Sequence, residues 1–250
     1  HHLQHTLLAL RNGKHVICEK PMSITAAEVK IMTDEAKKLG LFLMEALWPP
    51  FQPSYLKASA ILESGKMGRL MHMSGKFAFI SPYDPELRTY NPELGGGSLL
   101  DIGIYPVMDI LRYMGEPEKI AASAVFSPTG IDESISVIFK FSDGRLAEAY
   151  SSFSNMAGVS TEFNCEKGNL ILSRGRDRAQ HLFIEFPNDS EDRVFTPPAQ
   201  GYQHEAVEVM NCLDKGLTES PVVPLSFTLT LASTLDAIRK VAGIRYPGRD

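Results

Sequence analysis

Two ionisable side chains lie four residues apart just after a glycine-rich turn. Residues 95–109 are Gly-Gly-Gly-Ser-Leu-Leu-Asp-Ile-Gly-Ile-Tyr-Pro-Val-Met-Asp, which predicts a helix beyond the glycines with Asp101 and Tyr105 on one face. The glycines allow a backbone or a flat ligand to approach closely, and a helix start offers free N–H groups to an anion. The segment therefore predicts an active-site wall. The alternative is a tight turn into a packed helix, with Tyr105 at the edge of the core.

A lysine and a proline end the first apolar strand that the sequence predicts. Residues 15–19 are expected to form a short buried strand, and Lys20 and Pro21 follow it. Because open α/β sheets bind their ligands at the carboxyl ends of their strands, Lys20 is expected to point toward a site. A lysine exposed to bulk water is the alternative.

The first part of the chain predicts a remnant of a Rossmann-type parallel sheet. A helix is expected from the capping box at Thr25 to Gly40, and a second strand is expected over residues 41–45. Strand, helix and strand make one right-handed parallel unit. We therefore assign residues 1–46 to the end of a dinucleotide-binding domain and residues 47–250 to a substrate-binding and dimerisation domain. The last helix of the chain is expected to be able to pack back on the dinucleotide-binding domain.

Alternation of polar and apolar residues predicts the sheet of this second domain, which makes the whole chain α/β and α+β. The apolar face of its first strand is expected to carry Met71, Met73, Phe77 and Phe79. Asp143-Gly144 predicts a hairpin turn. Further strands are expected at 119–126, 160–165, 169–173, 181–186 and 193–196. The result is a large, mostly antiparallel open sheet covered by helices on one face.

The composition is ordinary for a globular protein, and its charge favours a small molecule over a nucleic acid as the partner. The 250 residues carry a formal net charge of −5, whereas a nucleic-acid surface needs a clustered basic excess. Cys18, Cys165 and Cys212 have no paired spacing, which predicts reduced thiols in the cytoplasm. No apolar run approaches the roughly 20 residues of a membrane span, and no leader is visible. His204 and Glu205 lack a third ligand at metal spacing, so no metal is expected.

Five motifs occur in the order found in one enzyme superfamily. Glu-Lys-Pro ends the strand at residue 19, and Gly-Gly-Gly-Ser-x-x-Asp-x-Gly-x-Tyr follows much later. The others are Glu45-Ala46-Leu47-Trp48 with Phe51 and Pro53, Gly201-Tyr202 with Glu205, and Glu219-Ser220-Pro221-Val222. The set resembles the Gfo/Idh/MocA oxidoreductases, and within them the dimeric dihydrodiol dehydrogenases, also described as NADP-dependent D-xylose dehydrogenases. Since a complete member begins with a Gly-rich strand-turn-helix, we expect the amino-terminal part of the nucleotide domain to be missing.

Hydride transfer at a carbonyl or an alcohol needs a proton moved at the substrate oxygen. A tyrosine phenol, whose usual pKa is about 10, becomes a better base beside an ammonium group. Lys20 is the expected neighbour, and Asp101 the carboxylate that holds it in place. The resemblance implies the same roles, with Tyr105 giving or taking the proton during hydride transfer between NADP (or NAD) and a small diol, sugar or related carbonyl compound. Many relatives carry histidine there, so the tyrosine favours the dihydrodiol or xylose type.

The resemblance also implies which residues contact the ligands. Those expected at the cofactor are Glu19, Lys20, Pro21, His2 and Trp48. Those expected at the substrate are Trp48, Phe77 and Tyr202. A homodimer formed through the open sheet face is implied as well. The chain alone, without a phosphate-cradling loop, is expected to be inactive.

Other interpretations stay open. Asp101 is also the kind of carboxylate that a helix dipole favours near its start, and Trp48 could be a core residue. Pro50 stands where relatives commonly carry arginine, which removes any role of that arginine here. The whole chain could be a non-catalytic dimerisation or sensing module that kept the substrate sheet. It could also be an enzyme with another activity of the superfamily, such as inositol or sugar oxidation.

Overall fold

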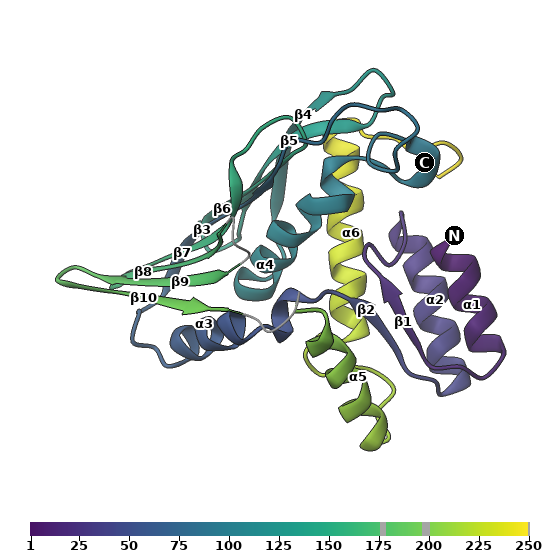
Figure 1. Ribbon diagram of the computed structural model, residues 1–250, viewed down its shortest axis with the longest axis horizontal. Coiled ribbons are helices and arrows are strands. Elements are labelled where there is room, and N and C mark those ends of the chain that lie inside the picture. The colour runs from purple at the N-terminus through teal and green to yellow at the C-terminus, as the bar shows by residue number, and fades with distance from the viewer. Residues whose placement is uncertain (176–178, 197–200, 250) are drawn as a thin grey trace. The chain divides into compact units, whose positions relative to one another are not determined.

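Two compact units make up the chain. The computed structural model describes residues 1–175, 179–196 and 201–249 (Figure 1). The first unit comprises His1–Gln52 and Pro198–Asp236, and the second comprises Pro53–Pro197 and Ala237–Asp250. Because this boundary falls within helix α6 (Leu225–Ala242), that helix contributes residues to both units.

The first unit is built on a two-stranded parallel sheet. Strands β1 and β2 pair in register from Val16 with Leu43 to Glu19 with Ala46. This confirms the predicted remnant of a Rossmann-type sheet. Its elements are α1 (His2–Arg11), β1 (Val16–Glu19), α2 (Ala26–Leu39), β2 (Leu43–Ala46), the 3-10 turn η1 (Pro49–Phe51), α5 (Gln203–Asp214) and the start of α6.

Helix α2, which connects the two strands, begins and ends where its sequence predicts. The Thr25 side chain accepts a hydrogen bond from the Glu28 N–H at 3.3 Å, as expected of an N-cap residue. Gly40 follows the last helical residue with φ of 63°, the left-handed conformation that glycine adopts most readily. The two caps set the ends of the helix that connects the parallel strands β1 and β2.

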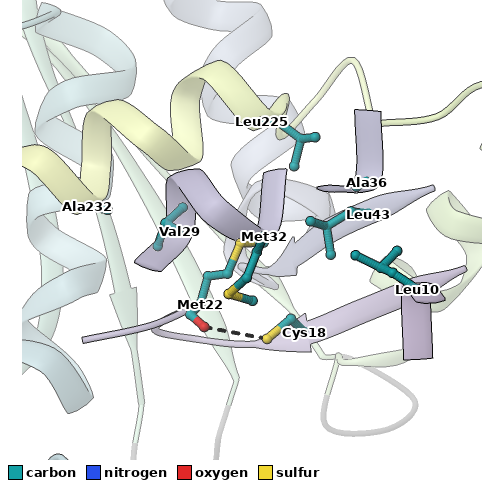
Figure 2. Packing of buried hydrophobic residues seen from close by; sticks show 9 residues of the cluster. All are labelled: Leu10, Cys18, Met22, Val29, Met32, Ala36, Leu43, Leu225 and Ala232. Carbon is teal, nitrogen blue, oxygen red and sulfur yellow. Dashed lines mark hydrogen bonds between the residues drawn. The ribbon is translucent and has the colours of Figure 1, made fainter. Parts of the chain in front are cut away.

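A cluster of buried side chains joins the helices and strands of the first unit (Figure 2). Its members are Leu10, Cys18, Met22, Val29, Met32, Ala36, Leu43, Leu225 and Ala232. The Cys18 thiol donates to the Met22 carbonyl at 3.6 Å, so the loop after β1 is tied to the core on both sides of Lys20. Leu225 and Ala232 bring α6 into the same core.

An eight-stranded sheet forms the second unit, in the order β10-β9-β8-β7-β3-β6-β5-β4. Strands β3 and β6 pair in parallel and the other neighbouring pairs are antiparallel. The predicted large, mostly antiparallel sheet is confirmed. Its strands are β3 (Leu70–Ala78), β4 (Lys119–Phe126), β5 (Asp132–Lys140), β6 (Leu146–Ser152), β7 (Gly158–Cys165), β8 (Gly168–Arg174), β9 (Gln180–Phe186) and β10 (Asp189–Phe195).

Helices of the second unit cover one face of this sheet. They are α3 (Pro53–Glu63) and α4 (Ile104–Met114), together with the short turn η3 (Leu99–Gly103). The second unit also contains the short turn η2 (Pro92–Leu94) and the end of α6. Helix α4 packs on β3 and β6, and α3 packs on β8 and β9 (Figure 1). A Cβ on Gly75 of β3 would lie 2.7 Å from the Cβ of Pro106. Glycine at this position therefore allows α4 to lie directly on the sheet.

The predicted apolar face of β3 is partly wrong. Met73 is buried, but Met71 is 41% exposed. Pairing with β7 shifts between Leu70 and His72, so Met71 has no partner residue on that strand. A bulged residue of this kind turns its side chain out of the regular alternation.

One stretch of the second unit passes a membrane-span test by length and composition, which the sequence analysis did not expect. Within the residues that the structure describes, Pro92–Met114 reaches a mean hydropathy of 1.2 over an 18-residue window. That window is 83% buried inside the fold. Core helices of globular proteins pass the same test, and α4 packs on the sheet as such a helix does.

Candidate active site

Lys20 lies one residue beyond the carboxyl end of β1, as predicted. Its peptide bond to Pro21 is cis. The imidazole Nδ1 of His2 donates to the Pro21 carbonyl at 2.9 Å, so the first turn of α1 holds the loop that carries Lys20. The structure therefore brings together Lys20, Pro21 and His2, three of the residues expected at the cofactor, and Glu19 ends the strand beside them.

A buried carboxyl that sequence reasoning gave no role lies beside this loop. Glu45 of β2 is 2% exposed, and its Oε1 accepts from the Met22 N–H at 2.8 Å. Burial raises the pKa of Glu45 to about 7, an increase that the Met22 N–H, the Thr228 hydroxyl and the charge of Lys20 partly offset. The signal available in the sequence was a glutamate inside an apolar strand, where an acid needs a partner.

Two predicted substrate aromatics meet within the first unit. The Trp48 ring, just after β2, lies 5.7 Å from the Tyr202 ring at an interplanar angle of 72°. The Gln52 amide donates to the Gly201 carbonyl at 2.8 Å and so fixes the turn before Tyr202. Tyr202 is 51% exposed, which leaves a face of the pair open to a ligand.

Glu205, in the first turn of α5, is a second buried carboxyl of the first unit. It is 7% exposed, and its Oε2 has no hydrogen-bond partner among the residues described. Burial, and to a lesser extent the charge of Glu19, raises the pKa of Glu205 to about 7. The site therefore contains a desolvated acid close to the end of β1.

In the second unit, Asp101 and Tyr105 do not share one regular α-helix. Leu99–Gly103 form a π-helical turn, and the α-helix starts at Ile104. Pro106 has no N–H to donate to the carbonyl four residues earlier, and its ring would crowd that carbonyl in an α-helix, which is a local reason for the chain to depart from a regular α-helix here. Such turns occur frequently at functional sites.

Both predicted catalytic side chains of the second unit have contacts that orient them. Asp101 is 8% exposed, and its Oδ1 accepts from Arg88 Nη2 at 2.7 Å. The Tyr105 ring stacks on Phe77 of β3, with centroids 5.7 Å apart and an interplanar angle of 28°. Phe77, expected at the substrate, therefore lies beside Tyr105. Arg88 was not predicted, because it lies in a loop with no motif of its own.

The predicted residues thus fall into two sets. The first unit holds those expected at the cofactor together with Trp48 and Tyr202, and the second holds Asp101, Tyr105 and Phe77. The pairing of Lys20 with Tyr105 joins residues of different units and stays a prediction. Within the described ranges, no three His, Cys, Asp or Glu side chains gather as metal ligands.

Comparison with known proteins identifies the family. The model "Oxidoreductase family, NAD-binding Rossmann fold" matches residues 1–47, and "GFO/IDH/MocA C-terminal domain" matches residues 55–171. The trans-1,2-dihydrobenzene-1,2-diol dehydrogenase of Mus musculus is 36% identical over 264 residues, covering 98% of this chain and 76% of that protein. The chain belongs to the GFO/IDH/MocA oxidoreductase family. The Oryctolagus cuniculus enzyme of the same name is 35% identical, over 98% and 78% of the two chains.

Solved structures of two oxidoreductases share the fold of this chain. An aldose-aldose oxidoreductase from Caulobacter crescentus, complexed with glycerol, has a TM-score of 0.86 at 25% identity and covers 97% of this chain and 74% of its own. A 3-ketoreductase from Actinomadura kijaniata, in complex with NADP and TDP-benzene, has a TM-score of 0.84 at 23% identity, over 96% and 75%. The family models and the dihydrodiol dehydrogenase relatives confirm the resemblance stated from the motifs.

The residues of the first unit fit the nicotinamide cofactor of this family. The family model over residues 1–47 is an NAD-binding Rossmann fold, which confirms the predicted cofactor class, NADP or NAD. The carboxyl ends of β1 and β2 carry an ammonium, Lys20, and an indole, Trp48. The Glu205 Oε2 is a buried acceptor without a donor among the described side chains. The Lys20 ammonium suits the phosphates or the ribose of such a cofactor. The Trp48 indole suits its flat nicotinamide ring, and the Glu205 acceptor suits the carboxamide of that ring.

The fold is expected to lose stability as the pH rises from about 5 to about 8. Burial raises the pKa of four carboxyls, to about 7 for three and about 6 for the fourth: Glu45, Glu205, Asp132 and Asp109. A carboxyl with a raised pKa binds its proton more tightly in the folded chain than in the unfolded one, so the folded state is penalised once that proton leaves. Thermal unfolding should show a midpoint at least about 3 °C higher at the lower pH.

The same measurement on Glu45→Gln provides the control. Its midpoint should depend less on pH than that of the wild type, because one of the four titrating groups is gone. A wild-type midpoint that is higher at about pH 8 than at about pH 5 would contradict this expectation.

Proposed function

We propose that the protein is an NADP-dependent dehydrogenase that transfers hydride between the cofactor and a small diol, sugar or related carbonyl compound. The observation that carries this proposal is the phenol of Tyr105, stacked on Phe77 and placed four residues after a carboxylate that Arg88 orients. A phenol held in place by ring stacking is suited to moving a proton at a substrate oxygen. The names of the curated relatives, diol dehydrogenases, support the substrate class.

The proposed chemistry divides the work between the two units. NADP, when bound, supplies or accepts the hydride. Tyr105 Oη gives a proton to the developing alkoxide in reduction, or takes one from the hydroxyl in oxidation. The ammonium of Lys20 stabilises the phenolate form of that group. Asp101, in turn, holds Lys20 in place and balances its charge.

Ligand positions follow from the same assignment. Lys20, Glu19, Pro21, His2 and Trp48 would hold the nicotinamide half of the cofactor. The edge-to-face pair of Trp48 with Tyr202 and the ring of Phe77 present apolar surfaces for the C–H face of a ring substrate. A carbocyclic diol and a sugar share this combination of an apolar ring face and hydroxyls.

We also propose a homodimer, formed through the face of the sheet that α3 and α4 leave open, in a reducing, cytoplasmic setting. On that face Ile138 of β5 is 52% exposed and Leu146 of β6 is 48% exposed, which gives apolar surface for a second copy. The three cysteines are free, as expected of reduced thiols.

A substrate and cofactor screen tests the proposed function. The full product of the gene is incubated with NADP⁺ or NAD⁺ and with a trans-dihydrodiol, D-xylose or myo-inositol, and the reduced nicotinamide is followed by absorbance. We expect the highest kcat/KM for a diol or D-xylose with NADP⁺, and a value at least about tenfold lower for inositol. A preference for inositol would indicate another activity of the family. No reduction of either cofactor by any substrate would indicate a non-catalytic module and would refute the proposal.

A further inference from the structure

The glycine-rich turn before Asp101 is held by hydrogen bonds to the loop just before it and to Tyr246, near the end of the chain. The Gly96 N–H donates to the Asn91 carbonyl at 2.9 Å, and the Gly97 N–H donates to the Thr89 carbonyl at 3.0 Å. On its other side, the Tyr246 hydroxyl donates to the Gly96 carbonyl at 2.6 Å. These hydrogen bonds hold the turn in one conformation, although three consecutive glycines alone would allow the backbone many conformations.

One buried carboxylate caps the π-helical turn that follows. Asp132, the first residue of β5, is fully buried. Its Oδ2 accepts from the Leu99 N–H at 2.6 Å and from the Ser98 hydroxyl at 3.0 Å. Leu99 is the first residue of η3, so Asp132 satisfies a helix-start N–H of the kind that an N-cap side chain usually satisfies.

Ser98, the residue in the N-cap position of η3, does not cap the turn with its own side chain. Ser98 makes no side-chain bond to a backbone N–H of the turn. Its hydroxyl instead lies 3.0 Å from both Asp132 Oδ2 and the Ser151 hydroxyl. The cap is therefore supplied by β5, because Asp132 lies 33 residues after Leu99 in the sequence.

The second oxygen of Asp132 lies against the glycine-rich turn. Its Oδ1 has no hydrogen-bond partner among the described residues. A Cβ on Gly97 would overlap this oxygen, and φ of 114° at Gly97 is a conformation that other residues rarely adopt. Glycine at 97 is therefore what allows the carboxylate to reach the start of η3.

This arrangement costs stability near neutral pH. Burial raises the pKa of Asp132 to about 7, although the bonds from Leu99 and Ser98 oppose the rise. Since the folded chain holds this proton more tightly than the unfolded chain, ionisation of Asp132 disfavours the folded state as the pH rises toward about 7. A neutral side chain at this position would avoid that penalty, so stability alone gives no reason for a carboxylate.

We propose that Asp132 is a positioning residue for the reaction, which caps η3 from β5 and so fixes the segment that carries Asp101 and Tyr105. This inference rests on the proposed function. Asp101 is the third residue of η3, and Tyr105 follows in the first turn of α4. A carboxylate holds the Leu99 N–H more strongly than a neutral acceptor does. Loss of the charge should loosen the turn while the remainder of the fold stays intact.

The test compares the wild type with Asp132→Asn in the full gene product. At about pH 8, where Asp132 is mostly ionised, we expect kcat to fall at least about tenfold, with KM and the affinity for NADPH within about twofold of the wild type. The thermal midpoint at about pH 8 should be equal or higher, because the buried charge is gone. Amide hydrogen exchange over residues 97–103 should become at least about tenfold faster.

Two further variants serve as controls for the Asp132→Asn substitution. Asp109→Asn changes another buried carboxyl with a raised pKa, one that accepts from Tyr55 and Thr161 and does not touch the turn. It should leave kcat within about twofold and leave exchange over 97–103 unchanged. Ser98→Ala removes one donor to Asp132 and keeps the other, so it should give a smaller loss of kcat in a folded protein, even where Asp132→Asn folds poorly.

Each outcome of these measurements supports or overturns a positioning role for Asp132. Slower turnover together with faster exchange, at an unchanged or raised midpoint, supports a positioning role. A lowered midpoint with kcat reduced only in proportion to the folded fraction would mean that Asp132 is purely structural. Unchanged exchange over 97–103 overturns the proposal whether or not the wild type is active. A wild type without activity on any substrate overturns the proposed function instead.

Discussion

Replacing Tyr105 with phenylalanine is expected to lower kcat at least about a hundredfold while leaving the affinity for NADPH intact. The substitution removes the hydroxyl that would give or take the proton. It keeps the ring, which stacks on Phe77 at 5.7 Å, so packing around α4 should not change. Steady-state kinetics and a fluorescence titration of NADPH measure the two quantities separately.

A matched substitution exists on the same helix. Tyr113 also lies on α4, where its ring packs on Phe163 and its hydroxyl lies 2.7 Å from that of Ser59. Tyr113→Phe makes the same chemical change and loses one hydrogen bond, so kcat should stay within about twofold of the wild type. Turnover of Tyr105→Phe equal to that of Tyr113→Phe would reject Tyr105 as the acid or base.

Local signals predicted the elements that depend on neighbouring residues. The capping box at Thr25 and the glycine at 40 determine α2 because both act within one helical turn. Asp143-Gly144 likewise predicted the hairpin turn between β5 and β6, where Gly144 has φ of 87°. Such features need no knowledge of the rest of the chain.

Features that depend on distant partners were not predicted. The exposure of Met71 follows from a pairing shift against β7, about 95 residues later in the sequence. The division of the expected helix into η3 and α4 had a local signal in Pro106, which cannot donate in an α-helix. The sequence shows where that proline is, but not which of the two helix types the tertiary packing then selects.

The candidate site shows the same division. Lys20 and Tyr105 stand in motifs that mark the end of a strand and the start of a helix, so their types and places were accessible from the sequence. Arg88 and Asp132 lie in unremarkable segments and act through contacts made only in the folded chain. Residues that position others are therefore the ones that sequence reasoning misses most easily.

The glycine-rich turn should be intolerant of even one added methyl group. Gly97→Ala is expected to lower the free energy of unfolding by about 3 kcal/mol or more. Two costs combine: φ of 114° is strained for alanine, and the new Cβ would overlap Asp132 Oδ1 and lie 3.0 Å from the Tyr246 hydroxyl. Both obstacles are fully or nearly fully buried side chains, so neither can simply swing into solvent.

Gly144→Ala isolates the first of these costs. Gly144 has φ of 87°, but nothing lies within 4 Å of a Cβ built there. Its substitution should cost only the strain of the backbone, about 1 kcal/mol. Urea unfolding of the two variants, side by side, gives the difference as a shift in midpoint. Equal midpoints would mean that the carboxylate can withdraw from Gly97 without cost, and would remove the steric basis for a rigid turn before Asp101 and Tyr105.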